Sequence, residues 1–195
     1  MTTIYQHFGK QTLLPVRLRE IQQFILNKGV VAQIERYPCE TRNSLIGIFQ
    51  KYYDIAPPYC ERPLIVRIGY SREASEGAQR LVQAKEMLHC LDPNEATSPT
   101  KDAVSRLVND LLFEAAEREI GLPAQVDHLN FLNALRVLMP IAALDVIRPA
   151  YKAGKVTVEQ IAAEARLPAP FVAVTLTDEW RIRHGALEGR PQAAG

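Results

Sequence analysis

The chain has 195 residues and a formal net charge of +1, with 47% hydrophobic and 23% charged residues. These values are typical of a globular protein with one sizeable core, or of one domain with a small appendage. A net charge this close to zero excludes a strong general attraction to nucleic acid or acidic membranes. Residues 1–10 lack the apolar core of a signal peptide, and no uncharged apolar run approaches the roughly 18 residues that cross a bilayer. We therefore expect a cytoplasmic protein with no membrane partner.

The cysteines also fit a reducing compartment. Cys39, Cys60 and Cys90 are an odd number with no short spacing between them, and no Cys-x-x-Cys pair exists. This pattern predicts three free thiols rather than a disulfide framework or a zinc knuckle.

The first part of the chain predicts one helix and three strands. Leu18–Leu26 has helical apolar spacing, and Gly29 follows its end. Val30–Tyr37 and Ser44–Gln50 are rich in β-branched residues and are separated by a polar break, so we expect two strands that pair with each other. Leu64–Tyr70 is the third predicted strand, preceded by a Pro-Pro turn.

The remainder of the chain predicts helices. Their apolar stripes and stop signals place them at Ala74–Leu91, from Ser98 to before Gly121, at Ala124–Leu138, and at Ile141–Ala153 with a bend at Pro149. After Gly154, the spacing of Thr157 and Gln160 predicts a capping box and a short helix to Ala165. Pro170 is placed to open another helix.

The most informative motif is Lys85-Glu86-Met87-Leu88-His89. The zinc-peptidase signature is His-Glu-x-x-His on a helix, in which both histidines reach the metal and the Glu polarises a zinc-bound water. Here Glu86 and His89 are in register, but Lys85 stands where the first His is required. Alone, Glu-x-x-His is common, and it also fits a surface Glu and a half-buried His.

The segments that precede and follow this motif occur in an order that gives it more weight. The strand residues 65–70 lead into Arg80–His89, followed by Ala134–Pro140 and then by Val156–Leu176. This order resembles the ImmA/IrrE family of zinc-metallopeptidase-like regulators, in which a strand precedes a helix carrying Arg-Phe-Thr-x-Ala-His-Glu-x-x-His. That family also has a Leu-Met-Pro segment and a closing segment with a helix-turn-helix look.

The resemblance implies a zinc site that has lost ligands. In the family, the third ligand is a Glu on the helix before Leu-Met-Pro; one register places Leu129 there, beside Asp127 and His128, and another places Ala103 there. Neither register supplies the Glu, and a protonated Lys85 has no lone pair to offer. Zinc is possible but not expected, and His89, Asp127 and His128 are weak metal candidates. Either Lys85 takes over the charge of the metal, or it extends to solvent.

The closing segment allows a weak nucleic-acid interpretation. Its second helix, Pro170–Thr177, has no Arg, Lys, Asn or Gln to read base edges, so an internal packing role is expected. Arg181, Arg183 and His184 remain weak candidates for contacts with DNA or a partner. We expect DNA binding to be weak or indirect.

Together these observations predict an α+β fold. The resemblance implies a zincin-like metallopeptidase domain over 1–140 with a small, mostly antiparallel sheet. A helical part follows over 141–185, and 186–195 form a tail. The implied function is that of a pseudo-peptidase that regulates or binds a protein, with a helix-turn-helix repressor as partner, in phage, mobile-element or stress circuits. The alternatives are a DNA-binding regulator that uses the closing segment and a zinc peptidase with unorthodox ligands.

Overall fold

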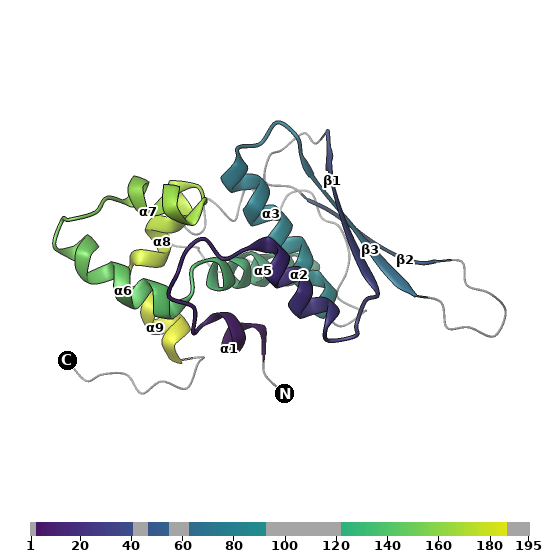
Figure 1. The fold of residues 1–195 in the computed structure, drawn as a ribbon, viewed down its shortest axis with the longest axis horizontal. Helices are drawn as coiled ribbons and strands as arrows, with labels where there is room; N and C mark the ends of the chain where they lie inside the picture. The colour runs from purple at the N-terminus through teal and green to yellow at the C-terminus, as the bar shows by residue number, and fades with distance from the viewer. Residues whose placement is uncertain (1–2, 41–46, 55–62, 93–121, 187–195) are drawn as a thin grey trace. The chain divides into compact units, whose positions relative to one another are not determined.

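The computed structural model describes residues 3–40, 47–54, 63–92 and 122–186, shown in colour in Figure 1. Side chains of residues 122–128 and 184–186 lie outside this description, although their helical backbone is included. The chain divides into two compact units. One comprises the described residues within Arg17–Asn133, and the other those within Met1–Val16 and Ala134–Gly195.

A mixed three-stranded sheet lies in the first unit. Its order is β1-β3-β2, with β1 at Gln33–Cys39, β2 at Ile48–Tyr53 and β3 at Leu64–Ser71. β1 runs parallel to β3, and β2 runs antiparallel to it. The expected pairing of the first two strands is therefore wrong, and so is the expected mostly antiparallel character. β3 is the most buried of the three strands, which suits a central position between two edges.

Helices α2 and α3 pack beside this sheet in the same unit. α2 spans Leu18–Leu26 as predicted, and its Gln22 side chain donates a hydrogen bond of 3.0 Å to the Ile34 carbonyl in β1. α3 spans Glu76–Leu88 and begins at Ser75, whose hydroxyl accepts from the Ala78 amide. Every residue of α3 from Leu81 to Leu88 is buried, and this includes the charged Lys85 and Glu86.

The other unit joins both ends of the chain. α1, Ile4–Phe8, begins with a capping box between Thr3 and Gln6 and buries Phe8 completely. The Gly9 carbonyl accepts a hydrogen bond of 3.2 Å from the Ala142 amide in α6, Ile141–Lys152. The periodicity of the sequence did not predict α1 or its place beside the C-terminal helices. The division between the units falls within α5, Leu122–Leu138.

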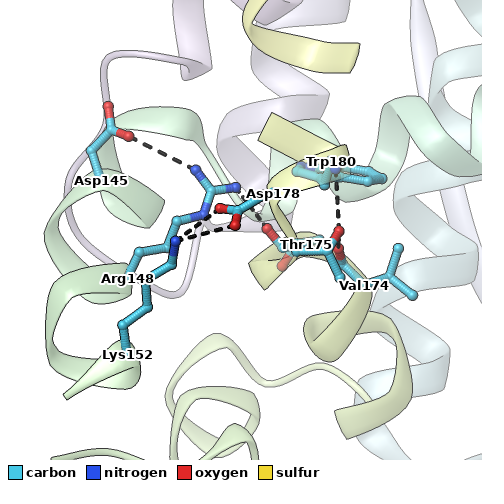
Figure 2. Close-up of polar contacts among 8 residues, drawn as sticks. Asp145, Arg148, Lys152, Val174, Thr175, Asp178 and Trp180 are labelled. Atoms are coloured by element: carbon cyan, nitrogen blue, oxygen red, sulfur yellow. Dashed lines mark hydrogen bonds and ion pairs between the residues drawn. The ribbon is translucent and has the colours of Figure 1, made fainter. Parts of the chain in front are cut away.

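The last three helices form a compact group with α6. They are α7 at Val158–Ala165, α8 at Ala169–Leu176 and α9 at Asp178–Ala186. The predicted Thr157–Gln160 capping box is confirmed, and Pro170 lies in the first turn of α8. Figure 2 shows the buried Arg148 of α6 donating to the Thr175 carbonyl near the end of α8, at 2.8 Å. Burial lowers the pKa of this guanidinium.

The α+β class predicted from the sequence is confirmed: the described residues form eight α-helices and the three-stranded mixed sheet. The predicted helix after Ser98 lies outside the described residues. No single described helix is long and apolar enough to cross a membrane, although the bent pair Leu129–Leu138 and Ile141–Lys152 together passes a test of length and composition. The predicted domain boundary near Pro140 and the cytoplasmic location stay predictions.

Candidate functional site

Lys85 and Glu86 form a buried ion pair near the end of α3. The Lys85 Nζ lies 3.0 Å from the Glu86 Oε1, and the side chains are only 5% and 4% exposed. Charged side chains are almost never buried this deeply unless they are paired, because desolvation is costly. Lys85 therefore lies inside the molecule, and the alternative in which it extends to solvent is wrong.

His89 ends α3 and lies between two carboxylates. The helix tightens there into the 3-10 turn η1, His89–Leu91. The His89 Nδ1 is 2.7 Å from the Asp92 Oδ2, whereas the Nε2 faces the Glu86 Oε2 at 3.9 Å. A carboxylate on one ring nitrogen fixes the orientation of an imidazole, which is also how metal-binding histidines are commonly held.

Asn130 of α5 completes this cluster. Its Nδ2 donates to the Asp92 Oδ2 at 2.6 Å and lies 3.1 Å from the His89 Nδ1. The preceding residue, Leu129, which one sequence register places at the third-ligand position, has a side chain that is 55% exposed. Sequence reasoning missed both Asp92 and Asn130. The only local signal was a carboxylate three residues after His89.

Strand β2 covers the same face of α3. Alternate residues of a strand point to one side, and here Gly47, Phe49 and Lys51 share the inward side. The Phe49 ring lies 5.4 Å from the His89 ring, centroid to centroid. A Cβ added at Gly47 would collide with the Glu86 side chain, with the Cδ only 2.6 Å away. Glycine is therefore required at position 47 because the backbone closely approaches the carboxylate.

Cys90 lies next to this cluster and is fully buried. Burial raises the pKa of its thiol to about 12, Lys51 opposes that rise, and the charges of Asp92 and Glu86 add to it. A thiol held in this state is a poor nucleophile and a poor metal ligand, because both roles need the thiolate. Cys39 is half-buried and free, and Cys60 lies outside the described residues.

The donors of this cluster do not fit a catalytic zinc ion. Such an ion needs three protein ligands that converge, and the described residues contain no group of three His, Cys, Asp or Glu side chains able to hold a metal. Asp92 and Glu86 face opposite nitrogens of His89, and the Lys85 ammonium has no lone pair. Asp127, His128 and Ala103 cannot be added, since their side chains lie outside the described residues.

The candidate contacts in the C-terminal unit lie on α9. Arg181 and Arg183 are exposed, and Arg183 pairs with Glu179 one turn earlier. The His184 side chain lies outside the described residues. In α8, Phe171, Val172, Thr175 and Leu176 are buried. The helix expected to read bases in a helix-turn-helix unit is thus largely used for packing.

Comparisons of the chain with protein-family models, with curated proteins and with solved structures found no match. The resemblance to the ImmA/IrrE family stays a hypothesis drawn from the motif order in the sequence.

Proposed function

We propose that this chain is a pseudo-peptidase of the ImmA/IrrE type, a non-catalytic protein that regulates or binds a partner. By that resemblance, its partner is a helix-turn-helix transcriptional repressor. The proposal rests on one observation: the ammonium of Lys85 lies 3.0 Å from Glu86 at the position where the family has its first zinc-binding histidine. A positive charge next to this carboxylate supplies electrostatically what a metal ion supplies in the active relatives.

Two further contacts support a non-catalytic role for Glu86. A catalytic base must reach a water or a substrate atom, whereas this carboxylate is 4% exposed and is bound to Lys85. The Gly47 backbone closes over its other side so tightly that no methyl group fits between them. With Lys85 on one side and Gly47 on the other, Glu86 has a structural role and does not reach a water or a substrate atom.

The alternatives receive less support. A DNA-binding role needs an exposed recognition helix with polar side chains, and α8 instead buries residues such as Phe171 and Leu176. A zinc peptidase with unorthodox ligands needs a converging donor set, which the described residues lack. Both alternatives remain outcomes of the experiments below.

Two measurements test the proposal. Elemental analysis of protein purified without chelator should find far less than about one zinc per chain, the content that a catalytic site requires. Repressors captured from the native host should then be purified and titrated calorimetrically with the parent and with Glu86→Gln. Equal binding by both, with an intact repressor, is expected. Repressor cleavage that Glu86→Gln abolishes would show a working peptidase instead.

A further inference from the structure

The inward residues of strand β2 lie one after another over the buried cluster. Gly47 contacts Glu86, the ring of Phe49 faces the ring of His89, and Lys51 is close enough to influence the Cys90 thiol. We call residues 47–51 the strap. The three covering residues are alternate positions of one strand. Displacing that strand would therefore expose the Glu86 carboxylate, the His89 imidazole and the Cys90 thiol together.

The strap is a weakly anchored part of the sheet. β2 is an edge strand whose ladder hydrogen bonds, within the described residues, go to β3 alone. Two of its inward residues face polar groups: Gly47 lies against the Glu86 carboxylate and Phe49 against the His89 imidazole. Segments with little apolar burial and an open edge are those that unfold locally, below the free energy of global unfolding.

We propose that the strap opens as a unit while the rest of the fold stays intact, and that it gates access to Glu86, His89 and Cys90. This conformational device goes beyond the proposed function and does not depend on it, because opening requires only the packing of β2 on α3. In the closed state the cluster is sealed from ligands. In the open state a carboxylate, an imidazole and a thiol become accessible at one place.

Cys90 provides the reporter. In a Cys39→Ser, Cys60→Ser background it is the only thiol, and it is fully buried when the strap is closed. Labelling with iodoacetamide should proceed in the native protein at a rate that barely changes with low concentrations of urea. That independence is expected because opening a strap exposes little surface, whereas global unfolding exposes much and depends steeply on urea.

A methyl group placed under the strap should favour the open state. Gly47→Ala puts a Cβ against the Glu86 side chain, and we expect it to speed Cys90 labelling by about tenfold or more. In a Lys85→Met, Glu86→Ala background the colliding atoms are gone, so the same Gly47→Ala change should have little effect. Gln50→Thr is the control on the same strand, because Gln50 is exposed and the change keeps a residue suited to a strand.

Native-state hydrogen exchange of the parent chain tests the same proposal without a variant, so it still applies if Gly47→Ala fails to fold. In the parent chain, the amides of residues 47–51 should exchange well before those of β3, and with a weaker dependence on urea. The proposal is overturned if these amides and Cys90 react only at the rate of global unfolding. It is equally overturned if Gly47→Ala speeds labelling no more than Gln50→Thr does.

Discussion

The Asp92 Oδ2 accepts from Asn130 at 2.6 Å across 38 residues of sequence, and the same oxygen lies 2.7 Å from the His89 Nδ1. This carboxylate therefore ties the end of α3 to α5 and determines which nitrogen of His89 faces Glu86. The contact underlies the first prediction.

Asn130→Ala should destabilise the protein by about 1–3 kcal/mol, because it leaves a largely buried carboxylate without its amide donor. Leu129→Ala, one residue away with an exposed side chain, should change stability by less than about 0.5 kcal/mol. Urea unfolding followed by circular dichroism measures both. Equal effects of the two substitutions would mean that the Asp92–Asn130 contact does not stabilise the fold.

The buried pair of Lys85 and Glu86 gives a second prediction. Lys85→Met alone should cost about 3–5 kcal/mol, since it leaves the Glu86 carboxylate buried and uncompensated. Adding Glu86→Leu should recover most of that loss, because removing both charges also removes their desolvation penalty. Chemical denaturation of the parent, Lys85→Met, Glu86→Leu and the double variant forms a complete cycle. A double variant as unstable as Lys85→Met alone would rule out a paired role for these side chains.

A third prediction concerns zinc. Lys85→His should raise zinc affinity above that of the parent, since the His89 Nε2 faces the same region while Asp92 holds the Nδ1. Affinity should stay poor, because two histidines fall short of the three ligands of a catalytic site. Adding Leu129→Glu should change nothing, as that side chain is exposed. Competition titrations with a zinc indicator measure all three proteins. Negligible affinity in Lys85→His with an intact fold would remove the main support for the family resemblance.

DNA binding is the subject of the fourth prediction. The parent should not shift DNA at nanomolar concentration and physiological salt, because α8 is largely buried and the net charge is +1. If the parent shifts DNA weakly at low salt, the double variant Arg181→Ala, Arg183→Ala should shift it less. A sequence-specific shift by the parent alone would place the DNA-binding function above the proposed one.

The last prediction tests the joining of the two chain ends. Phe8→Ala should destabilise the unit that contains α6–α9 by about 3–5 kcal/mol, as expected for a fully buried aromatic side chain. Trp180 is the only tryptophan and lies in that unit, so its fluorescence reports the transition directly. Leu13→Ala is the control, since Leu13 is 81% exposed. An unchanged Trp180 transition in Phe8→Ala would contradict the joining.

The sequence by itself determined the elements with strong local signals. α2 and the capping box of α7 follow from apolar spacing and from side chains that bond the backbone three residues away. The α+β class and the shared location of Lys85, Glu86 and His89 on one helix end follow in the same way. These interactions are local, so the pattern of nearby residues is enough to predict them.

Only the tertiary structure decided the partners of these elements. β1 and β2 each pair with β3. α1 packs with residues more than a hundred positions away in the sequence. Residues close in sequence to these elements carry no signal for either contact. The sequence did not predict Asp92 and Asn130 as site residues for the same reason. A single Asp or Asn forms no repeating pattern from which a contact with a distant residue can be predicted. The burial of Lys85 also needed coordinates, because a lysine can extend to solvent or pair inside the core, and the choice depends on whether a carboxylate lies within reach.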